Sequence, residues 1–308
     1  MPLTKHDRVQ QNSAGPCISR LVETSPQPRT TDEMYLDLLK RNLTRALIAK
    51  EYERHTLAPR RPLLRSLHAI VKGILNPMSL ELVRLVRSGP EDYVQSGHEA
   101  RNRVEDAETM LGTLQLDQMQ FCINDVCDRG VPGDLLEAGV WRGGMTVFMR
   151  AVLKARGENL RRVWVVDSFA GLPAPDADAD SFGWEGGDMA VSLDEVKNNF
   201  MRYGLLDDRV AFLKGFFSVT LPQASIPALS VLRVDADLYE STLDVLNHLY
   251  PKLSVGGYAI FDDYQNLKDC RRAIDEYRHA HGISDPITTI DSRAVFWRKS
   301  DGPNARSS

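Results

Sequence analysis

The sequence predicts an α/β fold in which helices cover both faces of a doubly wound, mostly parallel sheet. Three observations in the second half of the 308-residue chain indicate this fold. Short apolar runs alternate with amphipathic stretches, as in chains that build parallel sheets from strand–helix units. The runs are continuously apolar, which is typical of strands buried on both faces. Acidic or glycine-rich segments follow several runs, at the edge of the sheet where such folds bind ligands.

The segment that precedes this region predicts helices rather than strands. Residues 1–30 are rich in Pro, Ser, Gln and Thr without periodicity, so we expect a disordered extension there. Apolar residues follow helical spacing after Asp32, which we interpret as an N-cap. Prolines separate the further helices that we expect at 67–75 and 80–86. We therefore expect residues 31–107 to form a helical cap or lid.

The expected sheet domain covers residues 108–300 and precedes a tail at 301–308. Amphipathic spacing predicts its helices at 114–129, 145–156, 191–203, 241–253 and 271–281. Continuous apolar runs predict its strands at 135–136, 163–166, 210–213, 229–234, 258–261 and 294–297. The alternation of these elements supports a single sheet domain without internal repeats.

Composition restricts the partners that the chain is expected to have. The net charge is −4 and the basic pairs are short and scattered, which disfavours nucleic acid and anionic membranes as partners. No apolar run approaches membrane-spanning length, and the N-terminal residues lack the apolar region of a signal peptide. The four cysteines have no C-x-x-C spacing, which suits a reducing compartment. We therefore expect a soluble, cytoplasmic protein.

Two pairs of aspartates follow neighbouring apolar runs. Asp235 and Asp237 come after 229–234, and Asp262 with Asp263 follow the next predicted strand. Clustered carboxylates are unfavourable unless a cation or a shared proton offsets their charge. Oxygen ligands without nearby Cys or His suit magnesium, manganese or calcium. The alternative is that one or two of these acids, Asp237 above all, cap the helix that follows.

A glycine-rich turn and a second acid indicate a cofactor cradle. The turn reads E-A-G-V-W-R-G-G over 137–144, between a predicted strand and a predicted helix, and its glycines allow backbone to approach a ligand. It matches neither the G-x-G-x-x-G of dinucleotide folds nor the phosphate loop. Asp167 ends the next strand, where an acid commonly accepts the ribose hydroxyls of adenosine. The alternative interpretation is a tight turn with a helix-capping acid.

Together these segments resemble the macrocin O-methyltransferase (TylF) family, whose members use S-adenosylmethionine to methylate sugar hydroxyls on antibiotics. The resemblance spans roughly residues 32–298 and departs from the family pattern at Ser218-Val219, where an acid often stands. The matching segments are 109–110, 133–144, 167–173, 191–200, 214–217, 220–222, 233–239 and 261–264. The resemblance implies a sheet of the class I S-adenosylmethionine-dependent methyltransferase type.

The resemblance also implies roles for individual residues. It implies an S-adenosylmethionine site formed by Thr109, Met110, Glu137, Ala138, Gly139, Val140, Trp141, Gly143, Asp167, Ser168, Phe169, Gly171, Gly215 and Phe216. It implies that Asp235, Asp262 and Asp263 bind Mg²⁺ while Asp237 acts as general base. For Met110, simple core packing is the alternative. The implied acceptor is a glycosylated small molecule, and the implied assembly is a homo-oligomer with its interface in 31–107.

Other functions remain open at this point. A small phenol, a catechol or a glycolipid sugar would suit the same metal chemistry. A nicotinamide oxidoreductase is disfavoured because G-x-G-x-x-G is absent, and a non-enzymatic module because all four aspartates and the glycine turn are present. The polar loop that begins at Pro173 and contains Trp184 either closes over the site as a lid or is a surface insertion.

Overall fold

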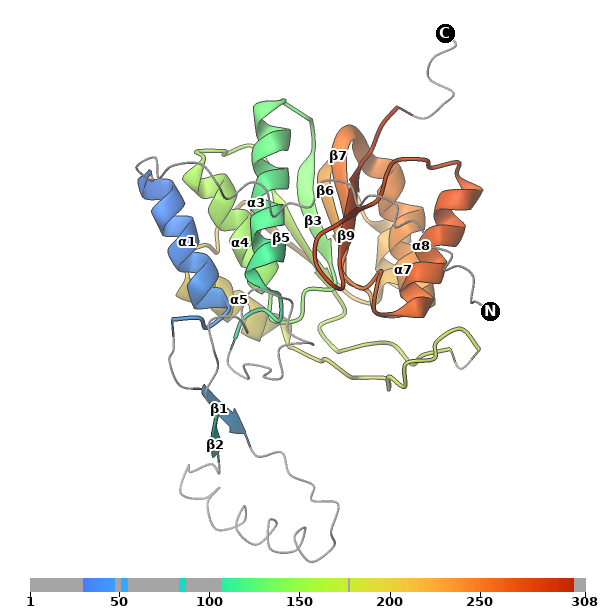
Figure 1. Ribbon diagram of the computed structural model, residues 1–308, viewed down its shortest axis with the longest axis horizontal. Helices are drawn as coiled ribbons and strands as arrows, with labels where there is room; N and C mark the ends of the chain where they lie inside the picture. Colours follow the sequence, from blue (N-terminus) through green and yellow to red (C-terminus); the bar gives the residue numbers. More distant parts are fainter. Residues whose placement is uncertain (1–29, 48–50, 55–82, 87–106, 177, 302–308) are drawn as a thin grey trace, which may run out of the picture.

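The computed structural model describes residues 30–47, 51–54, 83–86, 107–176 and 178–301. Apart from Thr30 and Asp301, the expected extension and tail lie outside these residues, as does the helix expected at 67–75. Figure 1 shows one α/β body, from which a two-stranded ribbon projects.

A seven-stranded sheet forms the centre of that body, in the order β5-β4-β3-β6-β7-β9-β8. The strands from β5 to β7 pair in parallel, whereas β9 pairs antiparallel with both β7 and β8. Their bounds are β3 (Asp134–Ala138), β4 (Val163–Asp167), β5 (Val210–Lys214), β6 (Leu229–Val234), β7 (Leu253–Phe261), β8 (Thr288–Thr289) and β9 (Val295–Arg298). The chain runs outward from β3 to β5 and then returns to β6, so β3 and β6 form the switch point where ligands bind in such sheets.

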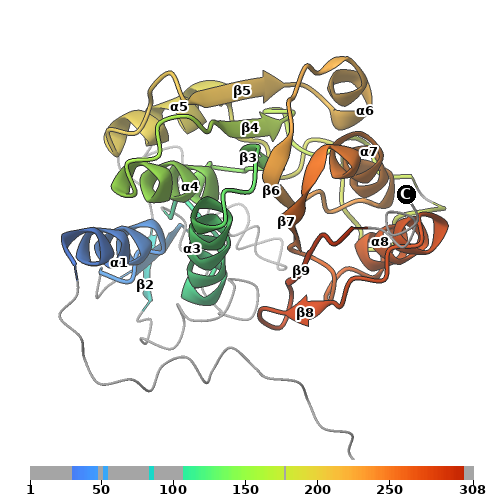
Figure 2. The ribbon, with the colours of Figure 1, turned by 90° about the horizontal axis from the view of Figure 1, so that it is seen from above.

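Helices cover both faces of the sheet, as Figure 2 shows. One face carries α1 (Thr31–Leu43), α3 (Thr113–Asp128), α4 (Gly144–Ala155) and α5 (Leu193–Arg202). The other carries α6 (Phe217–Thr220), α7 (Tyr239–Leu249) and α8 (Lys268–Ala280), with the 3₁₀ turns η4 (Leu221–Gln223) and η5 (Tyr250–Lys252). Alternate residues of each strand point into the two resulting cores, since Leu135 packs on the α3–α4 side and Leu136 on the α7 side. The predicted doubly wound sheet is confirmed.

The start of α1 differs from the sequence prediction by two residues. Thr30, rather than Asp32, is the N-cap, because the Thr30 hydroxyl accepts the Glu33 N–H at 3.2 Å. The Glu33 carboxylate in turn accepts the Thr30 N–H at 2.8 Å, which completes a capping box. The two reciprocal hydrogen bonds satisfy two N–H groups at once, which favours Thr30 over Asp32 as the N-cap.

The prediction of a helix at 80–86 is wrong for residues 83–86. β2 (Val83–Val86) pairs antiparallel with β1 (Glu51–Arg54), so the described part of 31–107 is a helix followed by a ribbon. Valine suits strands because its β-branched side chain packs well on a pleated surface. Local spacing could not reveal this pairing, because the partner strand lies far away in the chain. Among the described residues, no helix combines the length and the apolar character needed to cross a bilayer.

Candidate functional site

The carboxyl ends of β3, β4, β6 and β7 meet at one edge of the sheet and enclose two adjoining cavities. The larger has a volume of about 320 Å³ and the smaller about 40 Å³. Of the predicted residues, those lining the larger cavity include Met110, Gly139, Trp141, Asp167, Ser168, Gly171, Phe216, Asp235 and Asp237. Those lining the smaller include Thr109, Met110, Glu137, Val140, Trp141, Asp235, Asp237 and Asp262. The remaining predicted residues, which line neither cavity, are Ala138, Gly143, Phe169, Gly215 and Asp263.

The glycine turn after β3 brings backbone close to the end of β6. Gly139 has a φ of +83°, and a Cβ atom there would lie 1.7 Å from the carbonyl oxygen of Asp235. The Asp235 N–H donates to the Ala138 carbonyl at 2.8 Å, so the β3–β6 pairing continues past the strand ends. At the start of α4, the Gly144 N–H donates to the Glu108 carbonyl at 2.9 Å. This contact holds the segment with Thr109 against the turn.

Asp167 ties the turn after β3 to the turn after β4. One carboxylate oxygen accepts the Val140 N–H at 2.8 Å and the other accepts the Phe169 N–H at 2.7 Å. The Asp167 carbonyl also accepts the Gly215 N–H at 2.9 Å, which fixes the end of β5 beside it. The expected ribose-binding acid therefore lies in the larger cavity and organises the backbone of three strand ends.

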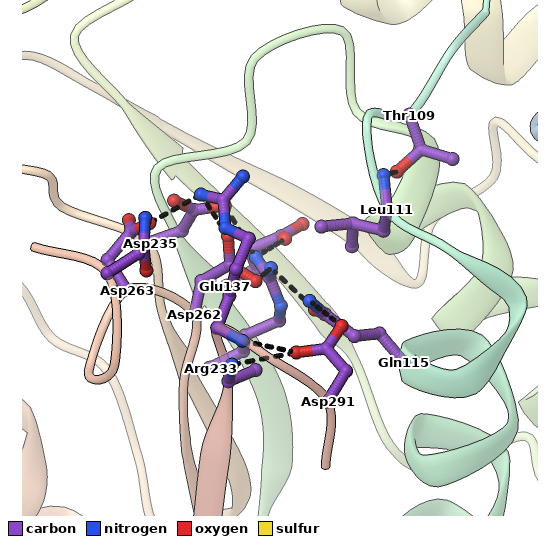
Figure 3. A network of polar contacts seen from close by, with 12 residues as sticks. Thr109, Leu111, Gln115, Glu137, Arg233, Asp235, Asp262, Asp263 and Asp291 are labelled. Carbon is purple, nitrogen blue, oxygen red and sulfur yellow. Dashed lines mark hydrogen bonds and ion pairs between the residues drawn. The ribbon is translucent and has the colours of Figure 1, made fainter. Parts of the chain in front are cut away.

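Arg233 lies at the centre of the acid cluster, as Figure 3 shows. It is 1% exposed and comes from β6, two residues before Asp235. One terminal nitrogen donates to Glu137 at 2.6 Å and to Asp235 at 2.9 Å. The other donates to Asp262 at 2.8 Å. A single guanidinium group therefore joins carboxylates from three neighbouring strand ends.

A second arginine, Arg293, enters the cluster from the connection between β8 and β9. Its Nη2 donates to Asp263 Oδ1 at 2.5 Å and to Asp262 Oδ2 at 3.3 Å. The Asn266 side chain donates to the same Asp263 Oδ1 at 3.0 Å. Asp263 Oδ2 and Glu137 Oε2 are buried and have no hydrogen-bond partner among the described residues.

The two arginines correct the sequence argument for a metal. Clustered acids were expected to need a divalent cation, yet Arg233 and Arg293 supply part of the counter-charge. The position of Arg233 in the sequence could have predicted its contacts, because an arginine inside a continuously apolar strand must pair with buried acids. Nothing in the sequence indicated the contact of Arg293 with the aspartates, because Arg293 lies far from them along the chain. Among the described residues, four carboxylates pair with these two guanidinium groups, namely Glu137, Asp235, Asp262 and Asp263. Asp237 adds a fifth carboxylate that pairs with neither arginine but lies close to Asp235 and Asp263.

The pKa values of the acids reflect this excess of negative charge. Burial alone would raise the pKa of Asp262, but Arg233 and Arg293 outweigh it and hold the value below its usual range. Burial raises the pKa of Glu137 to about 7, although Arg233 opposes the shift. The pKa values of Asp235, Asp237 and Asp263 are also raised, mainly by loss of hydration and then by a neighbouring aspartate. Added positive charge would therefore be favourable here.

The carboxylates that come closest together differ by one residue from the expected ligand set. Asp235, Asp237 and Asp263 each present an oxygen within 4.8 Å of the others. Both oxygens of Asp262 accept hydrogen bonds from arginine, at 2.8 and 3.3 Å. The structure thus brings all four aspartates together. The assignment of Asp262 as ligand and Asp237 as base stays a prediction.

Asp237 has a strained backbone and does not cap α7. Its φ is +60°, and the Leu238 N–H donates to the Ala236 carbonyl at 2.6 Å across it, which makes a γ-turn. The first N–H of α7, that of Tyr239, instead donates to Asp180 at 2.8 Å. The capping alternative for Asp237 is therefore wrong. Strain at such a position is common at functional sites, where the surrounding structure maintains it.

The loop between β4 and α5 lies against the ends of α7 and α8, as Figure 1 shows. Asp180 caps α7, and both the backbone and the hydroxyl of Ser181 donate to Asp269 of α8, at 2.8 and 2.7 Å. Trp184 lines the smaller cavity beside Asp237. Its indole N–H is buried and lacks a hydrogen-bond partner within the described chain. The loop therefore forms a wall of the site rather than a surface insertion.

Comparison with known proteins places these features in a family. The family model described as macrocin O-methyltransferase (TylF) matches residues 32–299. The chain is 42% identical over 281 residues to a mycinamicin III 3″-O-methyltransferase of Micromonospora griseorubida, covering 89% of this chain and 99% of that protein. It is 53% identical over 198 residues to an 8-demethyl-8-(2,3-dimethoxy-α-L-rhamnosyl)-tetracenomycin-C 4′-O-methyltransferase of Streptomyces olivaceus, covering 62% and 76%. The solved structure of the O-methyltransferase NovP is similar with a TM-score of 0.68 and 38% identity, over 88% of this chain and all of that chain.

Proposed function

The chain belongs to the macrocin O-methyltransferase family, and we propose that this S-adenosylmethionine-dependent enzyme methylates a sugar hydroxyl of a glycosylated natural product with the help of Mg²⁺. The observation that carries the proposal is the junction of the two cavities. Asp235 and Asp237 line both, so the acid cluster borders the cavity that contains Gly139 and Asp167.

The larger cavity fits S-adenosylmethionine in size and in lining. Gly139 contributes bare backbone to the cavity lining, and Phe216 contributes an aromatic side chain just after β5. Asp167 Oδ2 accepts only the Val140 N–H and keeps a lone pair for a ribose hydroxyl, whereas Oδ1 accepts the Phe169 N–H and a long hydrogen bond from the Ser168 hydroxyl at 3.4 Å. We assign Ser168 beside the ribose, Gly215 and Phe216 beside the adenine, and the turn with Thr109 and Met110 beside the methionine portion.

The acid cluster fits a hard divalent cation. All of its donors are carboxylate oxygens, and Asp263 Oδ2 is buried without a partner among the described residues. Asp235, Asp262 and Asp263 would hold the ion, although Asp262 shares its oxygens with two arginines. When bound, Mg²⁺ would stabilise the negative charge that develops on the acceptor oxygen.

Asp237 is positioned to take the proton from the acceptor hydroxyl. It lies where the cofactor cavity adjoins the acid cluster, so its carboxylate can reach a hydroxyl that faces the cofactor. Its raised pKa, caused by burial and then by the charges of Asp263 and Asp262, makes the ionised carboxylate a stronger base. The γ-turn fixes the direction of the side chain before the acceptor binds.

The loop with Trp184 supplies the acceptor wall of this proposal. Aromatic and apolar side chains with a few polar groups are typical of sites that bind small molecules, and Trp184 and Met189 line the smaller cavity together with the acids. The closed wall would exclude water from the reacting atoms. A homo-oligomer is also part of the proposal, favoured by the exposed apolar residues Met34 and Leu38 on α1, and sedimentation velocity tests it.

The proposal is tested by binding and then by turnover. We expect S-adenosylhomocysteine to bind in isothermal titration both with and without Mg²⁺, because the residues assigned to the cofactor differ from those assigned to the ion. Methyl transfer to a rhamnosylated antibiotic should depend on Mg²⁺ and stop when EDTA is added. Transfer to catechol in preference to any glycoside would contradict the assigned acceptor. Turnover that is unaffected by EDTA would contradict the metal.

A further inference from the structure

Arg293 is held in the acid cluster by a rigid connection between β8 and β9. Asp291 accepts the backbone N–H of Arg293 at 2.9 Å and that of Ala294 at 2.8 Å. The other oxygen of Asp291 accepts from the Gln115 side chain of α3 at 3.1 Å. Arg293 itself is 7% exposed. These contacts fix the backbone at Arg293, and Asp262 and Asp263 hold its guanidinium group.

The contacts of Arg293 leave one oxygen of Asp263 unused. Arg293 and Asn266 both donate to Asp263 Oδ1, at 2.5 and 3.0 Å. Asp263 Oδ2 is buried and lacks a hydrogen-bond partner among the described residues, in a side chain that is only 2% exposed. Leaving such an oxygen unsatisfied costs free energy, so its orientation favours a further positive ligand. Asp263 Oδ1 is thus held in place, and Oδ2 remains available.

Both arginines line the smaller cavity, but only Arg293 contacts Asp263. Arg233 lies inside β6 and holds three strand ends together. Arg293 lines the smaller cavity together with Asp235 and Asp237, two of the three aspartates whose oxygens lie within 4.8 Å of one another. A guanidinium group on that wall repels any second cation that binds there.

We propose that Arg293 is a positioning residue that sets the divalent-cation affinity of this site: it orients Asp263 for the ion and, through its own charge, keeps the ion weakly bound. This inference rests on the Mg²⁺ site of the proposed function. Arg293 itself is neither a ligand nor the base in that function.

The two effects of Arg293 on affinity have opposite signs, and the charge effect is the larger. Without Arg293, Asn266 still donates to Asp263 Oδ1 at 3.0 Å, so much of the orientation survives. The repulsion between this guanidinium group and a divalent ion held by the same aspartates is lost completely. We expect Arg293→Met to bind Mg²⁺ about tenfold more tightly or better at pH 8, since such charge interactions remain strong in a partly buried site.

The experiment compares Mg²⁺ affinity in wild type, Arg293→Met and Arg293→Lys by isothermal titration of EDTA-stripped protein. Thermal unfolding with and without Mg²⁺ is measured in parallel. The lysine variant keeps the charge, so its affinity should stay within about threefold of wild type. Arg293→Met should be less stable than wild type without Mg²⁺, and its melting temperature should rise more when Mg²⁺ is added.

Arg150→Met is the matched control. Arg150 is also buried and donates to both oxygens of Asp207, at 3.0 and 2.8 Å, but it lies on α4 away from the cluster. Its variant should lose stability without any change in Mg²⁺ affinity. If Arg150→Met gained as much Mg²⁺ affinity as Arg293→Met, loosened packing rather than charge would be the cause, and the inference would be overturned.

The remaining outcomes separate the inference from the proposed function. If wild type binds Mg²⁺ and Arg293→Met binds it equally or more weakly, the inference is overturned while the metal site stands. If the lysine variant tightens as much as the methionine variant, charge is not the cause and the inference also fails. If only Arg293→Met binds Mg²⁺, the inference is supported and Mg²⁺ dependence of the native enzyme is contradicted. If neither wild type nor Arg293→Met binds Mg²⁺, both the inference and the Mg²⁺ site of the proposed function are contradicted.

Discussion

Gly139 and Asp235 are in backbone contact, so close that a Cβ atom at position 139 would lie 1.7 Å from the Asp235 carbonyl oxygen. The same two segments share the hydrogen bond from the Asp235 N–H to the Ala138 carbonyl. The turn assigned to the cofactor and the strand end that carries the acid cluster are therefore one rigid unit. Any side chain at position 139 must therefore displace the backbone of Asp235.

Gly139→Ala is expected to disrupt both sites at once. The added methyl group cannot fit without separating β3 from β6, so S-adenosylhomocysteine affinity should fall at least tenfold and stability by more than about 2 kcal/mol. Isothermal titration and urea unfolding measure the two effects. Gly157→Ala is the control, because Gly157 has a similar positive φ of +67° but a Cβ atom there would meet nothing within 4 Å. It should cost only about 1 kcal/mol and leave binding intact.

Asp237→Asn is expected to lower kcat at least 100-fold, which is the usual scale for loss of a general base. Asparagine tolerates the positive φ of +60° at this position, so the turn should be kept. Mg²⁺ and S-adenosylhomocysteine should bind as in wild type. A clear loss of Mg²⁺ affinity would instead make Asp237 a ligand, in agreement with the close group that it forms with Asp235 and Asp263.

The fold and the approximate site could be predicted from sequence because their signals are local. The apolar runs at 163–166 and 229–234 identified two buried strands, and Asp167 and Asp235 lie at their carboxyl ends as expected. The order of strands in an open α/β sheet then determines which ends converge. Periodicity and position in the strand were sufficient for this part.

The contact of Arg293 and the ribbon could not be predicted because they depend on contacts between distant residues. Arg293 lies 30 residues from Asp263, in a connection with no distinctive pattern. β1 and β2 pair across a long separation, so the spacing within either segment could not reveal the pairing. Even the cap of α7 comes from Asp180, 59 residues before Tyr239. Only the three-dimensional structure reveals these contacts.

Asp167→Ala is expected to weaken S-adenosylhomocysteine binding by about 10- to 100-fold, which corresponds to the loss of hydrogen bonds to a charged group. The carboxylate also holds the Val140 and Phe169 N–H groups, so both turns should loosen. Isothermal titration measures the affinity. Asp134→Ala is the control, because Asp134 accepts two N–H groups at 2.9 Å at the opposite end of β3. Unchanged affinity in Asp167→Ala would move the ribose site elsewhere.

Glu137 is expected to make stability depend on pH. Its folded pKa of about 7 lies above the ordinary value of 4.5, so the folded state holds a proton that the unfolded state releases. The protonated carboxyl therefore contributes to the free energy of unfolding below pH 4.5. This contribution is lost as the pH rises to 7, which lowers the free energy of unfolding by about 3 kcal/mol. In urea unfolding with EDTA present, the free energy of unfolding of Glu137→Gln should not fall over this pH range, because Gln keeps an acceptor for Arg233 and never ionises. Parallel pH profiles for the two proteins would contradict the shift.

Trp184→Ala is expected to raise KM for the acceptor about tenfold while S-adenosylhomocysteine affinity stays within about twofold, because burial of an indole contributes strongly to small-molecule sites. Trp184 lines the smaller cavity with the acids but does not line the larger one. Steady-state kinetics and isothermal titration measure the two quantities. Trp184→Phe separates the contributions, since it keeps an aromatic ring and removes the buried N–H that lacks a partner in the described chain.

Phe182→Ala is the matched control for this prediction. Phe182 packs against Trp184 with ring centroids 5.0 Å apart, is 60% exposed and lines neither cavity. Its removal should leave KM nearly unchanged, because Asp180 and Ser181 still hold the loop on α7 and α8. An equal rise in KM for both variants would mean that the loop acts only through its overall position. A fall in cofactor affinity in Trp184→Ala would assign the indole to the cofactor instead, because the larger and smaller cavities meet at Asp237.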